Sequence, residues 1–261
     1  MILLYFFPGK IAMQQKNMIY SKIIGSGKPL IFLHGWGNDS SFFQELSELL
    51  VADRECHLID LPGFGNSKKP DAVWGTKDYA SCIIDYLKSH NIKNADILGH
   101  SVGGRIALRI AVYFPEYLDN LILISSAGIK SRKFLFRRIK IYILKKVAKI
   151  FKFLDKLTGK DFFKNKYSSK FASRDYLNAG DMKDIFIKIV NEDQENELKD
   201  VKARTLLIWG DKDTETPIDI GKTFSKKIKD SKLIVLKGKD HFPFLRGGAS
   251  LCAYQIKEFL K

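Results

Sequence analysis

The chain has 261 residues, of which 45% are hydrophobic and 28% are charged, as in an ordinary globular protein. This length fits one domain with room for an insertion, and its core needs no disulfide or metal for support. The three cysteines, Cys56, Cys82 and Cys252, are too scattered for a disulfide framework or a zinc site. We therefore expect a cytoplasmic protein in a reducing compartment.

The start of the chain shows no pattern typical of a membrane span or an export signal. No run in the sequence reaches the roughly 18 apolar residues that a spanning helix needs. The apolar segment 1–7 is short, has no basic flank and has no small-residue cleavage site. We interpret residues 1–17 as an N-terminal extension, with Met13 or Met18 as an alternative start.

The net charge of +15 is concentrated in one stretch. Residues 130–174 contain sixteen of the 44 Lys and Arg residues but two of the 29 acidic residues, Asp155 and Asp161, so their net charge is +14. The rest of the chain carries +1. This asymmetry indicates an insertion into an otherwise neutral protein.

Short aliphatic runs alternate with helical patterns on both sides of this stretch. Residues 19–24 predict a strand that turns through 25–29 into the next strand. Buried strands are expected at 31–33, 58–61, 95–98, 121–125, 206–209 and 233–236, and helices at 41–50, 77–90, 102–114, 218–228 and 249–260. The alternation predicts an α/β fold in which a parallel sheet carries helices on both faces.

The loop after the strand at 95–98 contains the most specific motif. Gly99-His100-Ser101-Val102-Gly103 matches Gly-x-Ser-x-Gly, which presents a serine hydroxyl on a strained turn between a strand and a helix. Glycines are needed there because a β-carbon would collide with the neighbouring chain. The helix N-terminus offers free N–H groups and a positive dipole to a developing oxyanion. Ser101 is the predicted nucleophile.

A serine nucleophile needs a base that a carboxylate holds in place. Of the five histidines, His241 is the one that is placed to be this base, in the loop after the strand at 233–236. Three acidic residues lie nearby. We favour Asp213, which lies far enough past its strand to reach the next loop, while Asp211 is expected to bind its own turn and Asp240 to point away.

A second glycine-rich loop, His34-Gly35-Trp36-Gly37, follows the strand at 31–33. Its glycines let main-chain N–H groups face a ligand, so the N–H groups of Trp36 and Val102 form the predicted oxyanion hole. His34 and His100 lie inside tight loops and are expected to fill space. This chemistry requires no metal and no organic cofactor.

Together these motifs resemble the α/β-hydrolase superfamily. The matching segments are residues 34–37, 60–67, 99–104, 210–213 and 240–242, and the resemblance covers residues 18–261. It implies a mostly parallel, eight-stranded sheet, a triad of Ser101, Asp213 and His241, and a helical cap inserted after the sixth strand. The implied layout is a core of 18–128 and 203–261 with a basic cap at 129–202. The loop 60–67 is implied to be a structural turn.

The resemblance implies a carboxylesterase-like or lipase-like serine hydrolase. Haloalkane dehalogenases and epoxide hydrolases are also similar, but they attack through an aspartate. Ser101 would attack a small or medium acyl ester or thioester, and water activated by His241 would release the acyl group. Carbon–carbon hydrolysis, lactone opening and the elimination of the menaquinone-pathway synthase remain open. Arg105 is similar in place to a substrate-binding arginine of relatives that act on carboxylates, and a surface salt bridge is its alternative role.

The basic stretch predicts an amphipathic helix. Its apolar residues are Phe136, Ile139, Ile143, Val147, Ile150, Leu154 and Leu157, and Arg138, Lys145, Lys149, Lys152 and Lys156 fall opposite. One interpretation is a lid that covers an acyl pocket and binds an anionic membrane surface peripherally. The other is a solvated outer face. A membrane-surface or partner-binding protein on a hydrolase scaffold is therefore the competing class, and nucleic-acid binding is not favoured because the sequence contains no RNA-binding or DNA-binding module.

Overall fold

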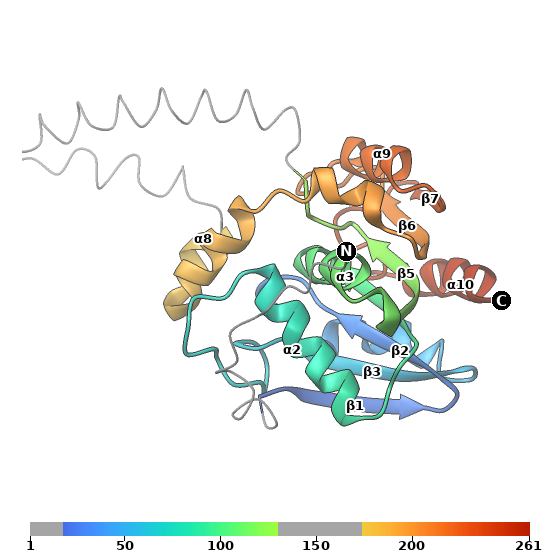
Figure 1. Cartoon of the computed structure of the whole chain (residues 1–261). Coiled ribbons are helices and arrows are strands. Elements are labelled where there is room, and N and C mark those ends of the chain that lie inside the picture. Colours follow the sequence, from blue (N-terminus) through green and yellow to red (C-terminus); the bar gives the residue numbers. More distant parts are fainter. Residues whose placement is uncertain (1–17, 130–173) are drawn as a thin grey trace, which may run out of the picture.

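A computed structural model describes residues 18–129 and 174–261, where seven strands form one sheet (Figure 1). The strands are β1 (Tyr20–Gly25), β2 (Lys28–Leu33), β3 (Arg54–Asp60), β4 (Ala95–His100), β5 (Leu118–Ile124), β6 (Arg204–Gly210) and β7 (Ser231–Leu236). Their order is β1-β3-β2-β4-β5-β6-β7, and every pair is parallel except β1 with β3. The predicted α/β class is confirmed, with seven strands in the described residues where eight were expected.

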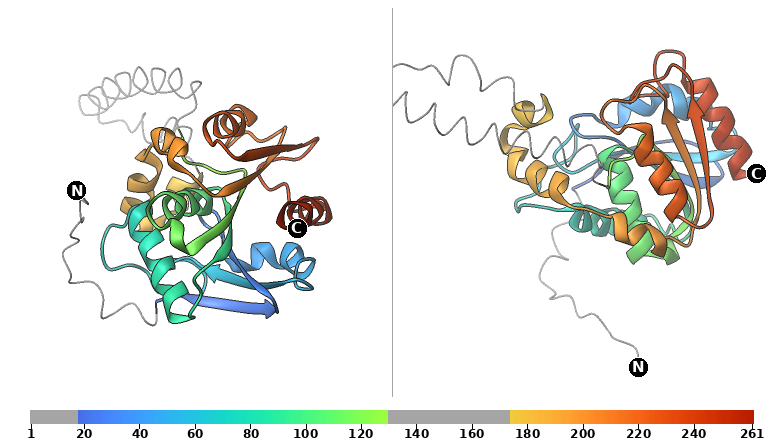
Figure 2. Two further views of the ribbon diagram at one scale, coloured as in Figure 1. Left: turned by 45° about the vertical axis from the view of Figure 1, so that its right-hand side comes forward. Right: turned by 90° about the horizontal axis from the view of Figure 1, so that it is seen from above.

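Helices cover both faces of the sheet (Figure 2). On one face lie α2 (Thr76–Ser89), α3 (Val102–Tyr113) and α9 (Ile218–Lys227), and on the other α1 (Gln44–Glu48) and α10 (Ala249–Leu260). Side chains alternate between the two faces along a strand, so Ile31 and Leu33 of β2 join one buried cluster while Leu30 and Phe32 join the other. A sheet covered on both sides explains the continuous apolar runs in β5 and β6.

One local expectation needs correction. The helix expected at 41–50 is a 3-10 turn, η2 (Ser40–Phe43), followed by the short α1, and Asp39 caps this turn by accepting from the Ser41 N–H at 2.9 Å. The strand expected at 19–24 is confirmed as β1, which turns directly into β2. Because β2 is already flanked by β3 and β4, β1 pairs antiparallel with β3 at the edge.

The chain leaves the sheet between β5 and β6. The described end of this insertion contains α7 (Arg174–Asn178), η4 (Gly180–Met182), α8 (Lys183–Asn191) and η5 (Glu195–Asp200). On α8, Phe186 packs against Trp36 with ring centroids 4.9 Å apart. With seven strands described, the insertion follows β5. The predicted basic helix within 130–173 and the extension at 1–17 lie outside the described residues.

A buried network fastens the end of the insertion to α3. Arg109 is 5% exposed, donates to Glu192 at 3.0 Å and also pairs with Glu197. Its Nε donates to the Thr76 hydroxyl at 2.8 Å, and the Thr76 N–H donates to Glu192 at 3.0 Å. Because each charged group has a partner, the network holds the residues after α8 against α2 and α3.

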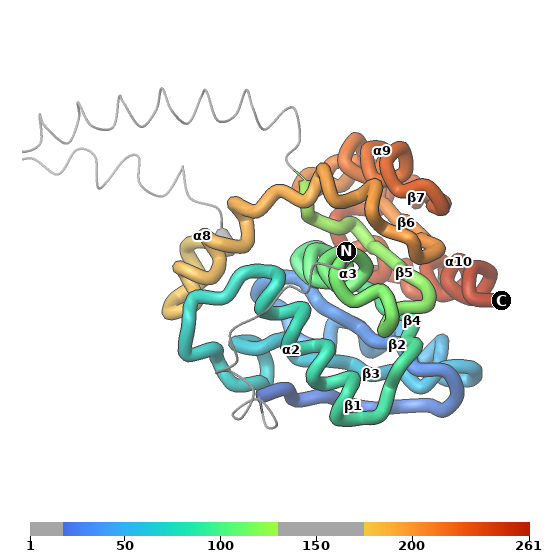
Figure 3. The backbone as a smooth tube through the Cα atoms, viewed as in Figure 1, coloured from blue at the N-terminus to red at the C-terminus, as the bar shows by residue number. Residues whose placement is uncertain are grey.

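The sheet reverses its direction of winding between β2 and β4, which are neighbours although β3 lies between them in the chain (Figure 3). The chain leaves β2 toward one edge of the sheet and returns to β4 on the other side. Open α/β sheets bind ligands at such a reversal, outside the carboxyl ends of the strands. Trp36 follows β2 there, and Ser101 follows β4.

Candidate active site

Ser101 lies at the turn between β4 and α3. Its φ of 51° and ψ of −112° belong to a region that residues other than glycine rarely adopt. The turn is tight, because a β-carbon on Gly103 would lie 2.0 Å from the carbonyl oxygen of Leu33. The N–H groups of Gly104 and Arg105 donate to the Ser101 carbonyl at 3.1 and 3.4 Å. The serine thus occupies the strained strand-to-helix turn that its motif predicts.

The loop after β2 lies against this serine. A β-carbon on Gly35 would be 3.2 Å from the Ser101 β-carbon. Trp36 follows Gly35, and Val102 begins α3. Within the part of the chain that the structure describes, neither the Trp36 nor the Val102 backbone N–H donates a hydrogen bond. Two free donors beside a serine suit an oxyanion, as the prediction for these residues requires.

The loops after β6 and β7 bring Asp213 and His241 together. Asp213 Oδ2 lies 2.9 Å from His241 Nδ1, and the two residues are 5% and 4% exposed. Burial alone would raise the pKa of Asp213, but the contact with His241 and the hydrogen bonds from Thr216 together lower it below its usual value. The ionised carboxylate therefore orients the imidazole through Nδ1.

The other two candidate carboxylates, Asp211 and Asp240, bind groups other than His241. Asp211 Oδ1 accepts from the Gly238 N–H at 2.6 Å, so it ties the loop after β6 to the loop after β7 rather than binding its own turn as expected. Asp240 accepts from the Phe242 N–H at 3.0 Å and pairs with Arg246 at 2.8 Å. The geometry therefore favours Asp213 as the carboxylate that orients His241.

Among the contacts of residues 18–129 and 174–261, no hydrogen bond joins the Ser101 hydroxyl to His241. The imidazole Nε2 instead lies 3.4 Å from Glu215 Oε2, a carboxylate that the sequence analysis did not single out. Burial, with a smaller contribution from the nearby Asp175 carboxylate, raises the pKa of Glu215. In free enzymes the hydrogen bond between serine and histidine is often long and shortens in the substrate complex.

His100 contacts His241 directly, beyond the space-filling role that we expected. Its Nε2 donates to the carbonyl oxygen of His241 at 2.9 Å. Burial, together with repulsion by His241, lowers the pKa of His100 to about 3, so the ring is neutral. His34 also has specific partners, since its Nε2 accepts from the Leu61 N–H at 2.9 Å. In the sequence, the position of His100 directly before Ser101 in the motif was the one indication of a contact with the other site residues.

Arg105 lies one turn into α3 and is 6% exposed. It donates to the Glu192 carbonyl at 3.0 Å, and its Nε has no partner among the described residues. The alternative of a surface salt bridge is wrong, because the side chain is buried, and this burial lowers the pKa of Arg105 to about 10. Its predicted contact with substrate stays a prediction.

Two further features complete the surroundings of the site. Asp60 accepts from the N–H groups of Ser40 and Asn66, both at 2.8 Å, so the loop 60–67 is a structural turn. Across the described segments, no three His, Cys, Asp or Glu side chains gather in a way that could hold a metal ion.

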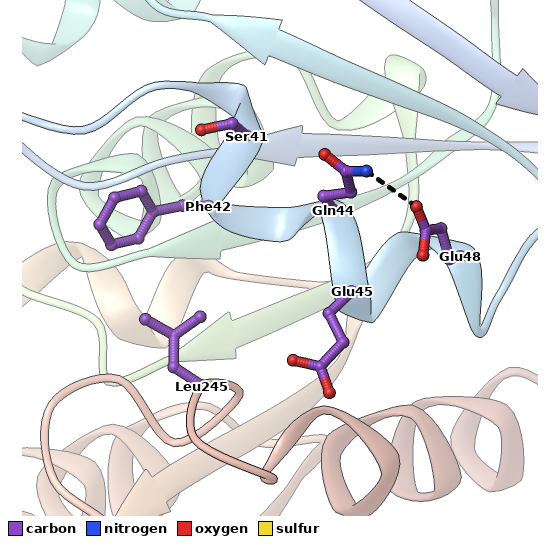
Figure 4. Close-up of a pocket in the computed structure, with 6 residues that line it drawn as sticks. All are labelled: Ser41, Phe42, Gln44, Glu45, Glu48 and Leu245. Atoms are coloured by element: carbon purple, nitrogen blue, oxygen red, sulfur yellow. Dashed lines mark hydrogen bonds between the residues drawn. The ribbon is translucent and has the colours of Figure 1, made fainter.

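An open hollow of about 490 Å³ lies beside η2 and α1 (Figure 4). Its lining residues are Ser41, Phe42, Gln44, Glu45, Glu48 and Leu245. None of these residues is a predicted site residue, so we assign this hollow no part in catalysis.

Comparisons with known proteins agree with this architecture. The family described as the alpha/beta hydrolase fold matches residues 28–247. The pimeloyl-[acyl-carrier protein] methyl ester esterase of Wigglesworthia glossinidia brevipalpis is 29% identical, over 92% of this chain and 96% of its own length. The 2-hydroxy-6-oxononadienedioate/2-hydroxy-6-oxononatrienedioate hydrolase of Paraburkholderia phymatum is 26% identical, over 76% and 75%.

Solved structures share the same fold. The esterase EaEST of Exiguobacterium antarcticum superimposes with a TM-score of 0.71 at 22% identity, over 93% of this chain and 96% of the esterase chain. The family match covers most of the chain, and the strand order, the serine turn and the loops after β6 and β7 fit it. The chain is therefore a member of the alpha/beta hydrolase family.

Proposed function

We propose that this protein is a serine esterase that cleaves a small or medium acyl ester through an acyl-enzyme on Ser101. The observation that carries the proposal is the buried pair of Asp213 and His241, 2.9 Å apart at the same sheet edge as the strained Ser101 turn. A relative whose name identifies a methyl ester as its substrate supports the ester class.

In the proposed mechanism, His241 Nε2 takes the proton of the Ser101 hydroxyl as the oxygen attacks the ester carbonyl. The carbonyl oxygen gains negative charge, and the N–H groups of Trp36 and Val102 stabilise it. The Asp213 carboxylate stabilises the imidazolium that forms. His241 then protonates the leaving alkoxide, and in the second half-reaction it activates water to release the acid and restore the Ser101 hydroxyl.

The decisive experiment is labelling with a fluorophosphonate probe, which reacts with an activated serine hydroxyl. The folded wild-type protein should be labelled, while the Ser101→Ala variant should not. A series of p-nitrophenyl esters of increasing chain length, with lactone and acyl-CoA substrates beside it, would then define the substrate class. A wild-type protein that stays unlabelled while it is folded would exclude the esterase.

Carbon–carbon hydrolysis is the second candidate. The Paraburkholderia relative is named for a 6-oxo dicarboxylate substrate, and the same Ser101, Asp213 and His241 could act on a ketone. If this candidate holds, a 6-oxo dienoate should be consumed while p-nitrophenyl esters are turned over slowly. The opposite preference would favour the esterase.

A membrane-surface role rests on the +14 charge of residues 130–174. In residues 18–129 and 174–261, no helix has both the length and the apolar character needed to cross a bilayer. We propose that any membrane contact is peripheral and electrostatic. Co-sedimentation with anionic vesicles should then occur at low salt and disappear at high salt. Vesicle binding that is equally strong at low and high salt would contradict an electrostatic contact.

A further inference from the structure

Thr216 places its hydroxyl between the two members of the buried pair. Its Oγ1 lies 2.7 Å from Asp213 Oδ2 and 3.2 Å from His241 Nδ1. It also lies 3.0 Å from the carbonyl oxygen of Ser125, directly after β5. Thr216 is 6% exposed, so water does not replace these contacts. One hydroxyl thus joins the end of β5 to the loops after β6 and β7.

The Thr216 hydroxyl cannot donate to all three of its neighbours, so at least one of these contacts must be a hydrogen bond that it accepts. A threonine hydroxyl has one proton to donate, and its oxygen can also accept. His241 Nδ1 faces a carboxylate and therefore carries a proton, which Thr216 Oγ1 accepts as a second acceptor beside Asp213 Oδ2. The Thr216 proton then goes to Asp213 or to the Ser125 carbonyl. A flipped imidazole would present a C–H group here and would lose both acceptors.

The surrounding backbone fixes Thr216 in this place. Its own N–H donates to Asp213 Oδ1 at 2.8 Å, and its carbonyl accepts from the indole N–H of the buried Trp209 at 2.8 Å. Ser125 has a φ of 44°, which is unfavourable for a residue other than glycine, while its N–H donates to the Ile208 carbonyl at 2.9 Å. This strained turn presents the Ser125 carbonyl to Thr216.

We propose that Thr216 is a positioning residue, whose hydroxyl holds the His241 ring with Nδ1–H toward Asp213, so that Nε2 is the nitrogen left to take the Ser101 proton. This inference rests on the proposed function insofar as His241 acts as the base. Thr216 itself touches neither substrate nor the reacting atoms. Its loss should therefore reduce the rate of the chemical step and leave substrate binding unchanged.

The test compares Thr216→Val, which removes the hydroxyl, with Thr216→Ser, which keeps it. The matched control is Thr205→Val, because Thr205 is also buried and its hydroxyl donates to a backbone carbonyl, that of Ala203 at 2.8 Å, at the far end of β6. With p-nitrophenyl acetate, Thr216→Val should lower kcat by about ten- to a hundredfold at nearly constant KM. Thr216→Ser and Thr205→Val should keep kcat near the wild-type value.

Two kinetic results would overturn the proposal. One is a kcat for Thr216→Val equal to that of Thr205→Val. The other is a raised KM at unchanged kcat, which would mean that the threonine only shapes the pocket. If circular dichroism shows that Thr216→Val does not fold, the kcat values of Thr216→Ala and Thr205→Ala are compared instead.

A second measurement separates this role from the enzyme assignment. Proton NMR can follow the hydrogen-bonded Nδ1–H of His241, assigned by its loss in His241→Gln. The resonance should shift or broaden by exchange in Thr216→Val and persist in Thr205→Val. If the wild-type protein neither hydrolyses esters nor reacts with the fluorophosphonate probe, the proposed function fails. An unchanged resonance in Thr216→Val would overturn the positioning role in either case.

Discussion

Asp213 Oδ2 and His241 Nδ1 lie 2.9 Å apart although 28 residues separate them in the chain. The parallel register of β6 with β7 pairs Gly210 with Leu236, so both strands end at the same level. The loops that follow them leave the same edge of the sheet and can meet. This proximity therefore follows from strand pairing rather than from local sequence.

Replacing Asp213 by Asn should leave the fold intact and reduce turnover by about ten-thousandfold, as the corresponding change does in a serine protease. An amide cannot stabilise the imidazolium and favours the wrong tautomer of His241. Steady-state ester hydrolysis measures the effect. Asp211→Asn and Asp240→Asn are the controls, because both carboxylates bind backbone N–H groups outside the pair. A similar loss in Asp211→Asn with an active Asp213→Asn variant would reverse the assignment.

The backbone strain at Ser101 should be measurable as stability. With φ at 51° and ψ at −112°, glycine is less strained here than any residue with a β-carbon. We expect Ser101→Gly to have a free energy of unfolding about 1 kcal/mol above that of Ser101→Ala, after the entropy cost of glycine. Urea unfolding of both inactive variants provides the comparison. Equal stabilities would mean that the turn stores no strain.

His100 should make stability depend on pH. Its folded-state pKa of about 3 lies below the ordinary 6.5, so between these values the unfolded chain binds a proton that the folded protein does not. The stabilisation is complete above pH 6.5 and falls as pH drops toward 3, by at most about 1.4 kcal/mol per pH unit. Urea unfolding from pH 7 to 5 measures this slope.

The variant that tests this slope is His100→Gln. Glutamine Nε2 can still donate to the His241 carbonyl but does not titrate, so His100→Gln should flatten the slope. Burial also lowers the pKa values of His34 and His57, so these two residues should keep part of the slope. If His100→Gln has the same slope as the wild-type protein, His100 is not the titrating group.

Glu215 should affect the reaction only weakly. Its carboxylate lies 3.4 Å from His241 Nε2, the atom that takes the Ser101 proton in the proposed mechanism. Because the Glu215 side chain is 59% exposed, the interaction is screened, and Glu215→Gln should change kcat for ester hydrolysis by no more than about fivefold. Glu195→Gln, which removes a remote ion pair with Lys227, is the control. A loss of kcat as large as that of Asp213→Asn would mean that Glu215 is itself part of the catalytic machinery.

Much of this architecture can be predicted from local sequence. Buried parallel strands are recognisable because both of their faces are covered, which makes the runs at 121–124 and 206–209 continuously apolar. The turn at Ser101 is recognisable because only glycine tolerates the close approach at Gly103, where a β-carbon would meet Leu33. Such constraints act over a few residues and therefore leave a readable pattern.

The sequence by itself determined the α/β class, the order of the motifs and the choice of Ser101 and His241 as candidate residues. The sequence favoured Asp213 over Asp211 and Asp240, and the tertiary structure supplied the contact of Asp213 with the imidazole. The tertiary structure also brought Thr216, His100 and Glu215 against His241. The physical reason is that these contacts cross between strands, where strand register and side-chain direction set the distances. Neither quantity is encoded in the spacing of residues along one loop.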